Sequence, residues 1–391
     1  MISSLAFLLA LLANVLFWIG LQSLYPVLPL YVASLGGTPT DNGLTTFAAA
    51  GTAVLSRLFI GALADRLGRK PVILMGASIA AATPVLYQAS HTIPSLLAIA
   101  ALRGVSIAAF TTGFQALLAD LAPAERRGEV FGMGGNSGAV ASLIGPLMGD
   151  WLMSQRGFGA TFELAAMAGG LCLLIALLIR EPHREVKRVA GTAPLQGLQE
   201  TLAHRNVRAG ILAVSPMGVA FGAMVTFWPL VAQENHLGTT GAFYSVYALG
   251  MLMVQILAGR LSDRIGRTRV MLPGMLLAGG AFGLIAQART DVASLLVAFG
   301  CGAGLGIART AIDALVLDDV PAALRGTAIA AEFTINDVWI GLGSALTGSL
   351  AGAWGFGAAY GAAGVACILV AIVLALTHQT PSIKRRTTLD G

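Results

Sequence analysis

The sequence contains few charged residues. They make up 11% of the 391 residues, and apolar residues make up 56%, whereas a soluble domain carries about 25% charged and about 45–50% apolar residues. The apolar residues also fall in long uninterrupted runs. This composition excludes an ordinary soluble domain and indicates a membrane protein.

The signatures of enzymes and metalloproteins are also missing. No Gly-x-x-x-x-Gly-Lys phosphate loop occurs, so ATP is not expected to drive the protein. The three cysteines lie inside apolar runs without metal or disulfide spacing, and the five histidines lie in loops or at helix ends. We therefore expect no cofactor, no metal and no enzymatic activity. The basic pI near 9.4 does not indicate nucleic acid, because the basic residues sit in short loops between apolar runs.

The apolar runs predict an all-α membrane protein. The first run, from Leu5 to about Ala33, is too long for a signal peptide, so we expect it to be retained. At 1.5 Å per residue, each run can cross a hydrocarbon core of ~30 Å. The remaining eleven predicted helices span about 42–64, 71–90, 95–120, 128–154, 160–179, 207–232, 239–262, 270–288, 293–318, 326–352 and 357–377.

A polar segment divides these twelve helices into two sets of six. We predict a six-helix bundle at 1–179, a linker at 180–206 with a short surface helix near Leu195–Ala203, a second bundle at 207–378 and a tail at 379–391. Lys and Arg lie mainly in the loops after even-numbered helices, in the linker and in the tail, whereas the opposite loops hold only Arg156 and Arg289. The positive-inside rule therefore places both termini in the cytoplasm.

A basic turn occurs twice at a fixed offset. Gly61-Ala-Leu-Ala-Asp65-Arg66-Leu-Gly68-Arg69 returns as Gly259-Arg-Leu-Ser-Asp263-Arg264-Ile-Gly266-Arg267, 198 positions later. The same offset relates Asp120 to Asp318 and the dipeptide at Arg127 to the one at Arg325. A constant offset over about a hundred residues indicates that the chain is two copies of one unit.

The doubled turn, the two sets of six helices and the intervening linker resemble the major facilitator superfamily. The resemblance implies two pseudo-symmetric six-helix bundles about an axis along the membrane normal, with a central substrate site that opens to each side in turn. It also implies a monomeric, proton-linked secondary transporter in the cell inner membrane.

The turn has a physical interpretation as a cytoplasmic gate. We expect Gly61 to allow close helix packing, Asp65 to face the positive start of the helix beginning near Gly326, and Asp263 to face the start of the helix near Gly128. We also expect Arg69 and Arg127 to share Asp120. The alternative is that these charges only set topology. The candidate gate residues are Gly61, Asp65, Arg66, Gly68, Arg69, Asp120, Arg127, Asp263, Arg264, Gly266, Arg267, Asp318 and Arg325.

The fifth predicted helix carries a second signal. Gly132, Gly145, Pro146 and Gly149 resemble the Gly-Pro motif of drug:proton antiporters in the superfamily, although Ala141 and Asp150 stand where the motif has glycine. Pro146 should bend the helix and free a carbonyl. The resemblance favours efflux over uptake; simple helix packing is the alternative.

Ionisable residues inside the membrane are functional candidates because lipid makes them costly. Arg103 precedes a glycine as in the superfamily's helix 4 motif, where this arginine is tied to proton coupling. A carboxylate without a partner in low dielectric can exchange a proton near neutrality. We predict Asp337 as the first candidate for that role and Glu332 as the second. Asp313 lies one turn from Arg309, and a static ion network of Arg309, Asp313 and Glu332 is the alternative.

Polar and aromatic residues predict a substrate cavity, with lipid-interface anchoring or packing as the alternative. Arg57, a turn before Gly61, is assigned to the gate or to snorkelling. The first helix carries no carboxylate, which argues against the cationic substrates of the best-known antiporters. The candidate cavity residues are Asn14, Phe17, Trp18, Gln22, Tyr25, Trp228, Tyr244 and Tyr247.

The sequence thus predicts a proton-coupled exporter of a small amphipathic organic compound, with the substrate, protons and the bilayer as its partners. Two alternatives remain open. One is a transporter of a metabolite such as a sugar, siderophore or nucleoside, and the other is a facilitator-like receptor that does not transport.

Overall fold

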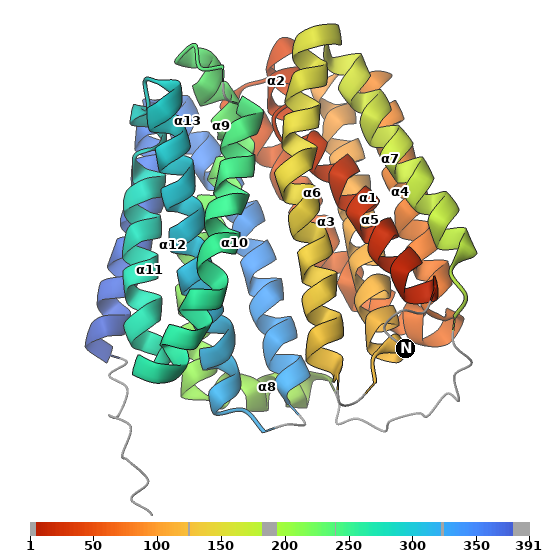
Figure 1. Ribbon diagram of the computed structural model, residues 1–391. Helices are drawn as coiled ribbons and strands as arrows, with labels where there is room; N and C mark the ends of the chain where they lie inside the picture. The colour runs from red at the N-terminus through yellow and green to blue at the C-terminus, as the bar shows by residue number, and fades with distance from the viewer. Residues whose placement is uncertain (1–4, 124–125, 182–193, 239, 322–323, 378–391) are drawn as a thin grey trace, which may run out of the picture.

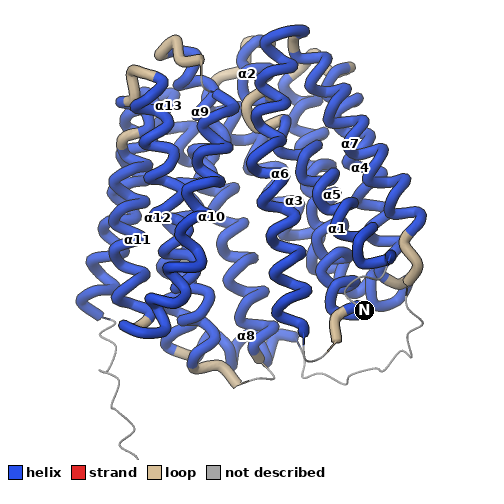
Figure 2. Tube along the Cα trace, in the orientation of Figure 1, coloured by secondary structure: helices blue, strands red, loops and turns tan. Residues whose placement is uncertain are grey.

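The computed structural model describes residues 5–123, 126–181, 194–238, 240–321 and 324–377, and these residues form helices and connecting turns without a strand (Figure 2). The tail at 379–391 and residues 182–193 of the linker lie outside the described residues. The helices are α1 Leu5–Ser23, α2 Leu28–Ser34, α3 Pro39–Leu67, α4 Arg69–Gln88, α5 Ile93–Leu121, α6 Arg127–Arg156, α7 Phe158–Leu178, α8 Pro194–Ala203, α9 Arg205–Glu234, α10 Thr240–Ile265, α11 Arg267–Gly283, α12 Asp291–Asp318 and α13 Arg325–Thr377.

The described helices fit twelve membrane crossings. Ten are long and apolar enough to span a membrane, with α1 and α2 counted as one. α13 has 53 residues, which is about 80 Å of helix and far too long for one crossing. It turns at Gly355, whose φ of 80° is a left-handed value that glycine adopts without strain. α6 is long enough to cross the membrane, but its glycine and polar residues make it less apolar than the other spans.

The first predicted helix is continuous in the sequence but broken in the structure. α1 ends at Ser23 and α2 begins at Leu28, with turns between them. Pro26 and Pro29 explain the break, because proline lacks the N–H that a helix interior needs. The predicted surface helix near Leu195–Ala203 is present as α8.

The helices form two groups. α1–α7 lie on one side and α9–α13 on the other, with α8 at one end of the molecule (Figure 1). One hydrophobic core is built from α9–α13, and three smaller clusters lie within α1–α7. Many large apolar side chains outside these cores are exposed, as expected for helices that face lipid. We call the end that carries α8 the α8 end, which is the predicted cytoplasmic side, and the opposite end the α2 end.

The two groups are in close contact toward the α2 end. A Cβ on Gly43 of α3 would collide with the backbone of Ser344 on α13, and one on Gly348 would lie 2.8 Å from the carbonyl oxygen of Pro39. Toward the α8 end, a Cβ on Gly61 or Gly326 would meet no atom within 4 Å. The tight contacts between the two halves therefore lie toward the α2 end, and Gly61 does not provide the tight packing expected from the sequence.

Candidate functional site

The turn between α3 and α4 is held by one arginine and two aspartates. Gly68 has a φ of 99°, which lets the chain reverse so that Arg69 starts α4. The guanidinium of Arg69 donates to Asp65 at 2.8 Å and to Asp120 at the end of α5 at 3.2 Å. The predicted pairing of Arg69 with Asp120 is therefore present. The carboxylate of Glu181 accepts from the backbone N–H groups of Arg69 and Lys70.

The turn between α10 and α11 repeats this geometry. Gly266 has a φ of 103°, and Arg267 donates to Asp318 at 3.2 Å and also to Asp263. The two turns differ in burial, because the side chain of Arg69 is 8% exposed and that of Arg267 is 21% exposed. The sequence repeat is therefore also a repeat of ion pairing, made within each half.

The predicted contacts of the gate across the two halves, from Asp65 and Asp263 to the helix starts of the opposite half, stay predictions. Asp65 and Asp263 bond to the arginine of their own turn, and Arg66, Arg264 and Arg325 are exposed. The side chains of Arg127 and Gly128 lie outside the described residues, so the expected sharing of Asp120 with Arg127 stays a prediction.

One ion pair joins the two halves directly. Arg57 of α3 donates to the carboxylate of Asp337 on α13, and both side chains are about a quarter exposed, at 28% and 24%. The expectation that Asp337 lacks a partner is therefore wrong. Its partner was missed because the two residues are 280 positions apart; the nearest signal was that Arg57 itself is a membrane-embedded charge.

A second ionic cluster joins α12 to α13. Arg309 lies 3.0 Å from Asp313 and 3.1 Å from Glu332, whose side chain is fully buried. The ring of Phe333 stacks 4.5 Å from the guanidinium carbon of Arg309. The predicted neutralising pair thus has a third member, and the cluster holds two carboxylates for one cation.

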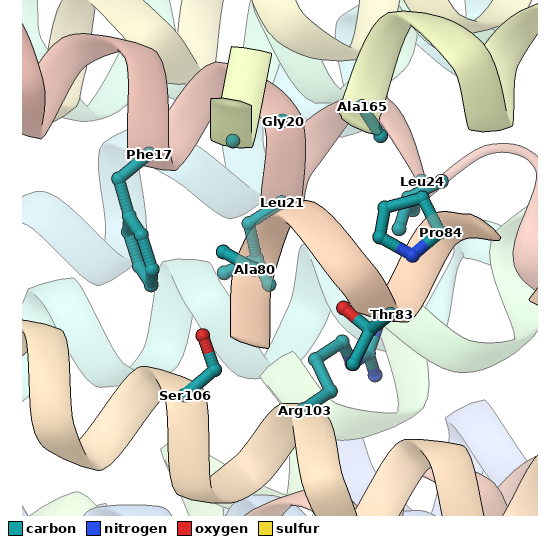
Figure 3. Close-up of a pocket in the computed structure, with 11 residues that line it drawn as sticks. Phe17, Gly20, Leu21, Leu24, Ala80, Thr83, Pro84, Arg103, Ser106 and Ala165 are labelled. Atoms are coloured by element: carbon teal, nitrogen blue, oxygen red, sulfur yellow. The ribbon is translucent and has the colours of Figure 1, made fainter. Parts of the chain in front are cut away.

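Arg103 lies inside the α1–α7 group. Figure 3 shows it reaching from α5 toward Thr83 and Pro84 of α4, in a pocket also lined by Phe17 and Ser106. The cavity volume is about 10 Å³, enough for about one water, so no substrate fits there in this state. The Nε of Arg103 lacks a hydrogen-bond partner among the described residues.

The motif glycines of α6 differ in what they contact. A Cβ on Gly149 would collide with the backbone of Ser23, and one on Gly145 would lie 3.2 Å from the carbonyl oxygen of Ile19. Gly132 faces open space. The motif therefore packs α6 onto α1 toward the α2 end. Pro146 lies within α6, and its carbonyl oxygen would lie 2.6 Å from a Cβ on Gly241.

The predicted cavity residues separate into packing and inter-helix contacts. Phe17 stacks on Phe110 and Trp228 stacks on Phe243, each at 3.9 Å between ring centroids. Both are almost fully buried, so they are packing residues here.

The remaining candidates connect different helices. Asn14 of α1 donates to Ser137 of α6 at 2.8 Å, and Tyr25 and Tyr244 bring the two halves together with ring centroids 6.0 Å apart. The ring of Tyr247 lies 6.0 Å from Phe221. Trp18 is half-buried and Gln22 is buried.

The sequence matches the family model described as Major Facilitator Superfamily over residues 10–344 and 232–390. Multidrug resistance protein MdtG of Citrobacter koseri is 26% identical over 93% of this chain and 91% of its own length. The match to MdtG of Enterobacter lignolyticus is 27% identical and covers 65% of this chain and 63% of that protein. Quinolone resistance protein NorA of Staphylococcus aureus is 29% identical over 43% of this chain and 44% of its own length.

Solved structures show the same fold at low sequence identity. The nucleoside transporter NupG, as a D323A mutant, superposes with a TM-score of 0.78 at 15% identity and covers 96% of this chain and 100% of its own. A bacterial homolog of the human lysosomal transporter Spinster, described as inward-facing and unoccupied, gives 0.76 at 16% identity, over 95% of this chain and 94% of its own.

Proposed function

Because the chain belongs to the Major Facilitator Superfamily, we propose that it exports small amphipathic organic compounds by alternating access, in exchange for protons. It is a multi-pass membrane transporter of a small-molecule substrate. The direction of transport, the proton coupling and the substrate class are the proposal.

The observation that carries the proposal is the ionic cluster of α12 and α13. Two carboxylates and one guanidinium leave an excess negative charge, and one of the carboxylates, Glu332, is fully buried, where isolated charge is costly. Uptake of one proton neutralises the cluster, and its release restores the charge. Glu332 and Asp313 therefore share the proton, and Arg309 sets the charge balance.

Asp337 connects the helix that carries Glu332 to the other half of the molecule. It lies on the same helix as Glu332 and pairs with Arg57 across the two halves. A proton on Asp337 weakens this pair, because an ion pair needs both charges. Protonation in the α12–α13 region is thereby connected to the separation of α3 from α13. Arg103 supplies a further membrane-embedded positive charge in the proposed coupling.

Efflux is supported by the α6 motif and by the names of the relatives. The names of MdtG and NorA refer to multidrug and quinolone resistance, and the resemblance of the Gly145–Gly149 motif to that of antiporters also favours efflux. A quinolone is therefore the first compound to test.

The predicted gate residues close the α8 end in the other conformation. Asp65 and Asp263 are exposed at that end and lie on the helix ends that approach α13 and α6 when the halves rock together. The distribution of Lys and Arg supports a cytoplasmic location for this end, with the protein in the inner membrane of the cell. We propose that the transporter works as a monomer with both termini in the cytoplasm.

The test has two stages. Cells expressing the wild-type chain are screened for resistance to a panel of amphipathic compounds that includes a quinolone. Each compound with raised resistance is then added to inverted membrane vesicles that hold a preformed pH gradient. The proposal predicts that the compound partly collapses the gradient. Resistance to none of the panel, or transport that leaves the gradient unchanged, contradicts it.

A further inference from the structure

α6 and α10, one from each half, are joined by two hydrogen bonds toward the α2 end. The carboxylate of Asp150 on α6 accepts from the backbone N–H of Gly241 at 2.9 Å. One turn further along, the hydroxyl of Ser245 on α10 donates to the carbonyl of Leu143 on α6 at 2.6 Å. These contacts close the molecule on the side opposite to α8.

The helices approach so closely that glycine is required at position 241. A Cβ there would lie 2.6 Å from the Cβ of Asp150 and 2.6 Å from the carbonyl oxygen of Pro146, closer than real Cβ atoms approach. Gly241 is also in the first turn of α10, which begins at Thr240. A carboxylate is stabilised at a helix start, where backbone N–H groups lack partners within the helix.

Asp150 is the one charged member of this contact. It is half-buried, so water at the α2 end reaches it. On α10, the titratable Tyr244 lies one turn after Gly241. Beside Asp150, Gly149 packs on Ser23 of α1, and its carbonyl accepts from the hydroxyl of Thr161 on α7. Arg156, on α6 itself, is exposed six residues further on.

We propose that Asp150 is a proton-sensitive latch that holds the α2 end closed. The ionised carboxylate accepts the Gly241 N–H and holds α6 against α10. A proton arriving from the α2 side converts it to a neutral acid, a weaker acceptor, and the halves separate there. Asp150 is a positioning residue that links proton arrival outside to outward opening. The assignment of the α2 end to the outside rests on the proposed function, but the latch itself does not.

The test is a distance measurement that needs no substrate. Spin labels are placed on cysteines introduced at Gln155 of α6 and Glu234 of α9, which are exposed at the α2 ends of opposite halves. The native Cys172, Cys301 and Cys367 are buried and compete little for the label. Distances in the purified full-length protein are compared at pH 7.5 and pH 5.5.

The latch predicts that acidification adds a longer-distance population in the wild type. Asp150→Ala should show this population at both pH values, with the ratio of long to short distances raised roughly 10-fold, the effect of losing one hydrogen bond to a charged group. Asp150→Asn keeps an acceptor but cannot take a proton, so its distances should not respond to pH. Glu163→Gln, which removes an exposed acid of α7 near the same end, is the matched control and should behave as wild type.

Three results would overturn the latch: a wild-type distribution that ignores pH, an Asp150→Asn variant that keeps the wild-type response, or a Glu163→Gln variant that loses it. If Asp150→Ala does not fold, the comparison of wild type with Asp150→Asn decides. Failure of the proposed efflux function would appear in the vesicle assay and would leave these distances unchanged.

Discussion

Arg57 of α3 and Asp337 of α13 form an ion pair that joins the two halves of the transporter. The tight helix contacts between α3 and α13 lie on its α2 side, at Gly43 and Gly348. The pair therefore lies on the α8 side of these tight contacts. A charge pair in this place can be made and broken as the halves rock.

The first prediction concerns Asp337. Asp337→Asn should lower proton-driven transport roughly 10-fold or more, since one lost charge interaction in a partly buried setting is worth about 1.4 kcal/mol or more. Transport down a substrate gradient should persist, because an amide of nearly the same size leaves the helix packing unchanged. The measurement is transport in vesicles with and without an imposed pH gradient, and Glu163→Gln is the control. Unchanged pH dependence in Asp337→Asn would remove Asp337 from the coupling mechanism.

The second prediction separates the members of the α12–α13 cluster. Glu332→Gln leaves Arg309 with one carboxylate, so folding should be maintained while the pH dependence of transport is lost. Arg309→Met leaves the buried carboxylate of Glu332 and the partly exposed carboxylate of Asp313 without their cation, and an unpaired buried carboxylate should cost about 3–5 kcal/mol. Unfolding in detergent and transport as a function of pH test both. Equal stability of the two variants would show that the charge balance does not matter.

The third prediction compares the two repeated turns. Asp120→Ala removes a partner of the buried Arg69, whereas Asp318→Ala removes the equivalent partner of the more exposed Arg267. Burial makes an incompletely paired charge costly, and exposure reduces the cost to about 1 kcal/mol or less. Asp120→Ala should therefore lower the unfolding temperature more than Asp318→Ala does. The reverse order would mean that the exposure of the arginines does not set the cost.

The fourth prediction uses two glycines of the same motif. Gly149→Ala forces a Cβ against the backbone of Ser23 and should destabilise the protein by about 1–3 kcal/mol. Gly132→Ala adds a Cβ in open space and should be tolerated. Thermal unfolding of the two variants in detergent is the measurement. If both were equally harmless, the packing of α6 on α1 would not depend on the motif.

The helical architecture could be predicted from the sequence because it depends on local features. Apolar runs, the polar segment after α7 and the doubled turn each report on nearby residues, and the pairing of Arg69 with Asp120 followed from the turn motif. The break between α1 and α2 was missed even though Pro26 and Pro29 mark it, because the apolar run continues through it.

The contacts across the two halves could not be predicted in this way. Arg57 and Asp337 are 280 positions apart, and no local pattern sets their pairing. In the sequence, Asp150 stands out only because it replaces a glycine of the motif. Its partner is the backbone N–H of Gly241, which no side-chain pattern can indicate. Phe17 and Trp228 were candidate cavity residues because the sequence does not distinguish an aromatic residue that packs against other helices from one that contacts a substrate.

The most direct test of proton-driven export is transport by the purified protein in liposomes. The vesicles are loaded with a compound that passed the resistance screen, and a pH gradient of either direction is imposed. The account predicts that the gradient drives accumulation of the compound against its own concentration gradient, that reversing the gradient reverses the flux, and that Asp337→Asn abolishes both effects. Accumulation that is the same with the gradient imposed, reversed or dissipated would contradict the account.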